Sequence, residues 1–192
     1  MIIPYILLFT SILIWLFPPF RQYKTEYFLF FLILALADPV IYLLLKTLSF
    51  QVTRTNLIIT FFMILSLIDS NKLKKGWIFI LLLLLVLLTA AIKLPLKEVY
   101  QIKIILSCII LFFILKDSLL YLNEHQTINL FYLIFILYEI TIIIKFIYTA
   151  SRTHTGTIYF YTTGFFEIFI GIFFCFYNMK NSPEYRLIKE HL

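Results

Sequence analysis

Residues 27–45 read YFLFFLILALADPVIYLLL, and one charged side chain, Asp38, lies among these nineteen positions. As an α-helix this stretch would be ~28 Å long, close to the hydrocarbon thickness of a bilayer. An apolar stretch of that length predicts a transmembrane helix. Similar apolar segments, bounded by charged residues, follow in the rest of the chain at 2–17, 52–68, 77–92, 101–122, 128–148 and 157–178.

Composition supports the same fold class over the whole chain. The 192 residues are 62% hydrophobic and 14% charged, whereas soluble domains are about half apolar and about a quarter charged. We therefore predict an all-α, polytopic transmembrane helix bundle over residues 1–178, with a short polar C-terminal tail at 179–192. The first segment lacks a basic start and a small-residue cleavage site, so we interpret it as a retained span rather than a signal peptide.

The number of spans depends on two short segments. Fourteen uncharged residues separate Arg54 from Asp69, and twelve separate Lys103 from Lys116. Such lengths also fit re-entrant or interfacial elements. We prefer seven spans, and six spans is the alternative.

The basic residues indicate an orientation and a partner. With seven spans, nine Lys and Arg residues fall on the side of the C-terminus and seven on the other, which favours an outside N-terminus and an inside C-terminus. The net charge of +6 is spread over short segments, so we expect contact with the lipid bilayer and no nucleic acid. The Lys-, Ile- and Phe-rich composition suggests a bacterial inner membrane. The seven basic residues on the side of the N-terminus are Lys46, Arg54, Lys93, Lys97, Lys103, Lys145 and Arg152. The nine on the side of the C-terminus are Arg21, Lys24, Lys72, Lys74, Lys75, Lys116, Lys180, Arg186 and Lys189.

Three acidic residues lie near the middle of predicted spans: Asp38, Glu139 and Glu167. An acidic side chain at that depth costs roughly 2.5–3.5 kcal/mol, and such residues usually face the interior of a bundle. We expect these three to line a ligand site or an ion pathway. The alternative is that each is protonated, hydrogen-bonded and structural.

Spacing suggests that two of the acids can meet. Glu139 lies fourteen residues before Thr153 and Glu167 fourteen residues after it, so the two should have nearly equal depth on antiparallel helices. If they approach, at least one carboxyl group would be protonated. Tyr132 shares a helical stripe with Glu139 and is a further candidate.

Lys145 is the basic candidate in the same span. It follows Glu139 by six residues, about 9 Å along a helix, which is too far for a simple contact. It can extend outward toward Arg152 and His154, or reach a carboxylate on another helix.

Small residues and a proline suggest packing features. Gly164, Glu167 and Gly171 share one stripe, where the glycines would let another helix approach closely. Pro39 should kink its helix and free the carbonyl group of Ala35.

No catalytic motif, metal-ligand spacing or cofactor motif is present, so an enzyme is the less favoured class, we predict no metal, and any cofactor is unknown. Three functions stay open. The first is a membrane subunit or sensor-like module that binds a membrane-protein partner, a second copy or a small hydrophobic ligand. The second is a proton- or cation-coupled transporter or channel. The third is a small lipid-modifying enzyme with two carboxylates as acid and base.

Overall fold

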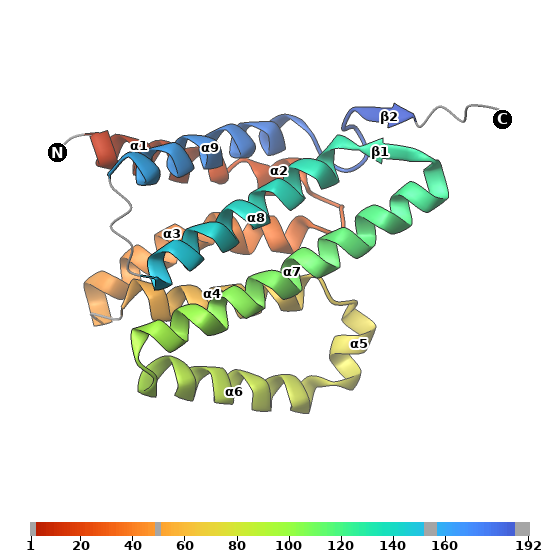
Figure 1. The fold of residues 1–192 in the computed structure, drawn as a ribbon. Helices are drawn as coiled ribbons and strands as arrows, with labels where there is room; N and C mark the ends of the chain where they lie inside the picture. The colour runs from red at the N-terminus through yellow and green to blue at the C-terminus, as the bar shows by residue number, and fades with distance from the viewer. Residues whose placement is uncertain (1–2, 49–50, 152–156, 187–192) are drawn as a thin grey trace.

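The computed structural model describes residues 3–48, 51–151 and 157–186. Each of the seven predicted apolar segments contains a helix, which confirms the helical class (Figure 1). Arg152, Thr153, His154 and Lys189 lie outside the described residues. The elements are α1 (Ile3–Trp15), α2 (Pro18–Arg21), α3 (Phe28–Leu48), α4 (Val52–Ser66), α5 (Ser70–Lys75), α6 (Trp77–Lys93), α7 (Leu96–His125), β1 (Thr127–Asn129), α8 (Leu130–Ala150), α9 (Thr157–Phe176) and β2 (Glu184–Arg186).

Three helices are long and apolar enough to cross a membrane, namely Phe28–Thr47 of α3, α7 and α8. They indicate that the protein is associated with a membrane. The short segment between Lys103 and Lys116 belongs to the 30-residue helix α7, which continues through both lysines. Helices α4 and α6, and Thr162–Phe176 of α9, are apolar but shorter. Helix length therefore supports three crossings directly, and seven crossings stay a prediction.

Six helices form a closed ring. Each one contacts the next in the order α1, α3, α4, α7, α8 and α9, and α9 returns to α1. Helix α6 lies outside the ring, where it packs against α4 (Figure 1). The Arg54 guanidinium at the start of α4 donates to the carbonyl oxygens of Ala91 and Ile92, and so holds the C-terminal end of α6.

The seven apolar helices run back and forth along one common direction, so their ends gather at two opposite ends of the molecule (Figure 1). We call one of these the Val52 end, where α4 and α7 begin and α8 ends. The opposite one is the Tyr27 end, where α3 begins directly after Tyr27. Helices α1 and α9 run in the same direction and pack side by side. The Arg21 Nε donates to the Phe176 carbonyl oxygen at 2.9 Å, which ties their Tyr27 ends together.

An aromatic cluster fills the ring at the Tyr27 end. Its members come from α3, α8, α9 and the residue before α3, and none is more than 1% exposed. Ring centroids lie 4.9 Å apart for Phe30 and Phe135 and 4.8 Å apart for Phe31 and Phe174. Such tilted and edge-on pairs add to the burial of apolar area. We call this cluster the aromatic plug: Tyr27, Phe30, Phe31, Phe131, Phe135 and Phe174.

A two-stranded antiparallel sheet, which the sequence did not predict, closes the corner between α7 and α8. Strand β1 pairs with β2 in the C-terminal tail, and Ile128 faces Tyr185. The Asn129 side chain caps α8 by accepting from the Phe131 amide and donates to the Met179 carbonyl oxygen. The described part of the tail is therefore docked on the Tyr27 end.

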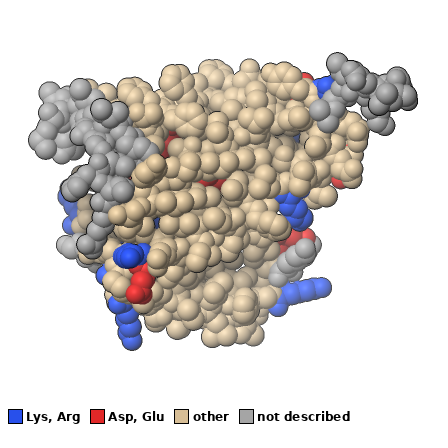
Figure 2. Space-filling view, in the orientation of Figure 1, with Lys and Arg blue, Asp and Glu red and all other residues tan. Residues whose placement is uncertain are grey.

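Most charged side chains on the visible face gather at the two ends of the molecule, and the broad surface between them is tan apart from small acidic patches (Figure 2). Large apolar side chains such as Phe79, Phe112 and Phe169 are each at least 65% exposed. Outward apolar side chains are what a bilayer accepts and water does not.

Candidate functional site

A cavity of about 480 Å³ lies inside the helix ring. It begins beyond the aromatic plug and extends to the first turn of α4 and the last turn of α8, at the Val52 end. All six ring helices contribute to its wall. Its lining includes five ionisable side chains besides tyrosines: Asp38, Lys103, Glu139, Lys145 and Glu167.

The three acids predicted from the sequence all line this one cavity, although they come from α3, α8 and α9. The closed ring explains why they meet, since each helix turns one face toward the same central space. Glu139 and Glu167 do not pair with each other. Glu167 pairs with Lys145, and Glu139 lies within electrostatic range of Lys103.

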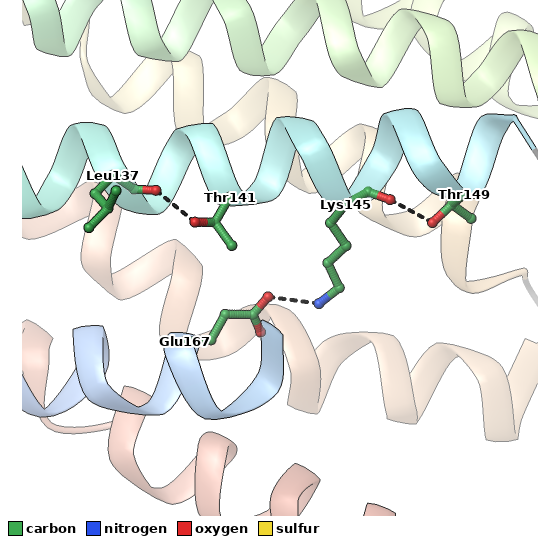
Figure 3. Close-up of polar contacts among 5 residues, drawn as sticks. All are labelled: Leu137, Thr141, Lys145, Thr149 and Glu167. Carbon is green, nitrogen blue, oxygen red and sulfur yellow. Dashed lines mark hydrogen bonds and ion pairs between the residues drawn. The ribbon is translucent and has the colours of Figure 1, made fainter. Parts of the chain in front are cut away.

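Glu167 is paired with Lys145 across the contact between α8 and α9 (Figure 3). The Lys145 Nζ lies 2.8 Å from the Glu167 Oε1, with the two side chains 30% and 16% exposed. The sequence left two possible directions for the Lys145 side chain, and in the structure it reaches a carboxylate on another helix. On either side of it, the Thr141 and Thr149 hydroxyl groups donate to the carbonyl oxygens of Leu137 and Lys145. Each threonine thus satisfies its hydroxyl within its own helix.

Glu139 is almost completely buried, with 2% of its surface exposed. Its Oε2 atom has no hydrogen-bond partner among the described residues. A buried polar atom without a partner costs free energy, roughly 1–3 kcal/mol and more when it is charged. Lys103 is the opposite charge that acts on this carboxyl group.

Lys103 is a site residue that the sequence analysis missed. We had counted it among the charges at a helix end, but it is 5% exposed and lines the cavity. Its Nζ lies 3.7 Å from the centroid of the Phe146 ring, a cation–π contact. A signal was available, because Lys103 falls on one helical stripe with Val99 and Ser107, all of which are buried.

Asp38 is the exposed acid of the three and lines the same cavity. It lies within electrostatic range of Glu167, Lys145 and Lys103. Helix α3 continues through Pro39, the next residue. Trp15 of α1 and Tyr138 of α8 line the same space, with ring centroids 5.1 Å apart.

The neutral polar side chains of α4 were also missed. Thr53, Asn56 and Thr60 lie at spacings of three and four, so they share one face of α4, and all three line the cavity. That spacing was readable as a polar stripe on an otherwise apolar helix.

The structure places Tyr132 away from the cavity. Its hydroxyl lies 3.0 Å from the Met179 sulfur, and its ring packs against Tyr27 of the aromatic plug. Tyr132 and Glu139 do share a helical face, but seven residues separate them by about 10 Å along the axis. A shared stripe therefore did not mean a shared site.

The two glycines of α9 differ from each other. A Cβ at Gly171 would lie 2.8 Å from Ile14 Cγ2 and 3.3 Å from the Trp15 ring, so Gly171 permits the close approach of α1. At Gly164, a Cβ would meet no described atom of another element within 4 Å. The expected packing role therefore applies to Gly171 and not to Gly164.

The cavity holds three carboxyl groups and two ammonium groups, so full ionisation would leave one excess negative charge. In the part of the chain that the structure describes, no three His, Cys, Asp or Glu side chains are grouped to hold a metal ion. Comparison of the chain with protein-family models, with curated proteins and with solved structures found no match.

Proposed function

We propose that the chain crosses the membrane seven times, with the Val52 end outside and the Tyr27 end in the cytoplasm. Two observations support this. The apolar helices alternate in direction, and their ends lie at the two ends of the molecule (Figure 1). Lys103 and Lys145, two of the seven basic residues first counted on the outer side, line the cavity instead. The count of Lys and Arg then becomes five on the outer side and nine on the inner side. A larger difference strengthens the positive-inside argument.

On this topology, we propose that the protein binds a small charge-bearing solute in the cavity. The solute would enter from the outer face, because the aromatic plug blocks the other end. One observation carries the proposal: a cavity of about 480 Å³ with five ionisable side chains lies inside a ring of apolar helices. This volume is within the range of small-molecule sites, about 300–1,000 Å³.

A purely structural role explains this arrangement poorly. Well-packed apolar side chains often replace a buried ion pair with no loss of stability. Here the charges surround open space, and a carboxylate oxygen of Glu139 has no partner among the described residues. Of the possible ligands, the five ionisable side chains in the wall favour one with a charged group over a purely hydrophobic molecule.

The binding proposal is tested by thermal unfolding of the purified protein with separate panels of small amines, carboxylates and amino acids. We expect at least one class to raise the unfolding temperature of the wild type. Asn56→Phe, which fills part of the cavity, should remove that shift, whereas Leu120→Phe on the exposed face of α7 should keep it. The proposal fails if no class shifts the wild type, or if Asn56→Phe responds as the wild type does.

Proton-coupled transport is the second candidate. The observation that favours it is the excess of carboxyl over ammonium groups in the cavity, together with the unpartnered Glu139 oxygen. Binding of one proton would neutralise the cavity, so solute binding and proton release can be linked.

Reconstituted vesicles with an internal pH dye test this candidate. A solute gradient should drive proton movement in the wild type, and Glu139→Gln or Glu167→Gln should abolish that movement without loss of folded protein. Unchanged proton movement in both variants would remove transport and leave binding as the function.

A further inference from the structure

We infer that the ligand is an organic monocation, an ammonium group on an apolar body, and that it binds between Asp38 and the aromatic pair Trp15 and Tyr138. This inference rests on the proposed binding function and names the chemical class of the solute.

The charge balance of the cavity points to a cation. Lys145 is engaged by Glu167 at 2.8 Å, which leaves Asp38, Glu139 and Lys103. Lys103 lies within electrostatic range of the buried Glu139, and its positive charge can balance the negative charge of one carboxylate. One carboxylate therefore lacks a counter-charge, and a single positive charge on the ligand would supply it.

Burial and exposure decide which carboxylate the cation reaches. Glu139 is 2% exposed and deep in the wall, and its free Oε2 can accept from a donor on the ligand. Asp38 is exposed and lines the cavity. The ammonium group therefore meets Asp38 directly, with Glu139 as a second acceptor.

Two aromatic rings in the cavity wall suit an organic cation. Trp15 and Tyr138 both line the cavity, their centroids lie 5.1 Å apart, and Tyr138 is within electrostatic range of Asp38. An aromatic face attracts a cation, and tryptophan does so most strongly. Lys103 already makes such a contact with Phe146 in the same cavity. The cavity is far larger than a single ion needs, so the apolar body of the ligand would fill it.

The experiment uses the full chain in lipid nanodiscs. Trp15 and Trp77 are its two tryptophans, so Trp77→Phe leaves Trp15 as the only indole reporter. The probes are benzylammonium, its neutral carbon analogue ethylbenzene, and the anion benzenesulfonate. We expect the cation to change Trp15 fluorescence saturably, with an affinity at least tenfold higher than that of either other probe.

Variants locate the charge that the cation meets. In the same background, Asp38→Asn should weaken binding of benzylammonium at least tenfold. Glu124→Gln removes the same charge from an exposed position near the end of α7 and should change the affinity less than twofold. If Asp38→Asn yields no folded protein, Glu139→Gln serves as the second variant, with at least a threefold loss expected.

The outcomes separate the two proposals. Equal binding of the cation and its neutral analogue, or an unchanged affinity in Asp38→Asn, would overturn the monocation inference while a binding cavity remains. Tighter binding of benzenesulfonate would overturn it in favour of an anionic ligand. Failure of all three probes would overturn the inference, and the solute panels described above would then decide the binding function separately.

Discussion

The two halves of the helix ring are built from opposite chemistry, although the same helices form both. Along α3, the plug residues Phe30 and Phe31 are 0% and 1% exposed, and Asp38 lines a cavity only seven residues later. Along α8, Phe135 belongs to the plug and Glu139 to the cavity. About one turn of α8 and two turns of α3 thus separate a dry aromatic core from a charged wall.

This difference shows how stability and function can be divided within one short bundle. Ring packing at the Tyr27 end supplies contacts that hold the helices together. The charged half weakens the bundle, because each ionisable group inside a membrane costs free energy. We therefore expect plug variants to affect folding, and cavity variants to affect binding with smaller effects on folding.

The largest expected effect is from truncation in the plug. Phe174→Ala removes a ring that is 0% exposed and should reduce the free energy of unfolding by about 3–5 kcal/mol. Phe169→Ala, on the same helix but 69% exposed, is the matched control and should change it by less than about 0.5 kcal/mol. Denaturant unfolding in detergent measures both. Similar losses in the two variants would show that the plug has no special role in stability.

The next effect is from the ion pair in the cavity wall. Lys145→Met leaves Glu167 without its partner, and because the pair is only partly buried we expect a loss of about 1–2 kcal/mol. Glu167→Gln made in the Lys145→Met protein should recover much of that loss, since the unpaired charge is then gone. A double-mutant cycle measures the coupling. Additive losses would mean that the two side chains do not stabilise each other.

The glycines of α9 should respond with opposite signs. Gly171→Ala puts a Cβ within 2.8 Å of Ile14 Cγ2 and should cost about 1 kcal/mol or more. Gly164→Ala meets open space and should stabilise the helix by up to about 1 kcal/mol. Unfolding temperatures of the two variants provide the comparison. A loss at Gly164 equal to that at Gly171 would contradict the close contact between α1 and α9.

The smallest effect concerns the sheet that docks the tail. The Tyr121 hydroxyl donates to the Glu184 carboxylate at 2.5 Å and lowers the pKa of that group below its ordinary value of 4.5, with help from Thr127 and His125. A lowered pKa stabilises the folded state above pH 4.5, and this contribution is lost as the pH falls through the lower folded-state pKa. The difference in unfolding temperature between wild type and Tyr121→Phe should therefore shrink on acidification. A difference that grows on acidification would contradict the assigned bond.

The helices were predictable because charged residues mark where apolar segments finish, and each of the seven segments contains a helix. The sheet was not predictable, because strands of three residues carry no usable alternation, and the partners Ile128 and Tyr185 lie 57 residues apart in the sequence. The position of α6 outside the ring also depends on contacts among helices far apart in the sequence.

The acids of the cavity were predictable because a bilayer makes such residues costly and therefore rare. Lys103 was missed because a basic residue near a helix end is usually a boundary residue, and only the full length of α7 places it in the wall. Tyr132 shares a helix face with Glu139 but does not line this cavity, because a stripe gives the face of a helix and not the depth at which a cavity stops.

Cysteine accessibility tests the division into a sealed and an open half most directly. Cys108→Ser and Cys175→Ser give a background without cysteine, and Asn56→Cys and Phe131→Cys then probe the cavity and the plug in sealed vesicles of known orientation. We predict that a membrane-impermeant maleimide labels Asn56→Cys from the outer face alone and labels Phe131→Cys from neither face. Labelling of Phe131→Cys from either face, or no labelling of Asn56→Cys in folded protein, would contradict a solute cavity that is open at one end and closed by the aromatic plug.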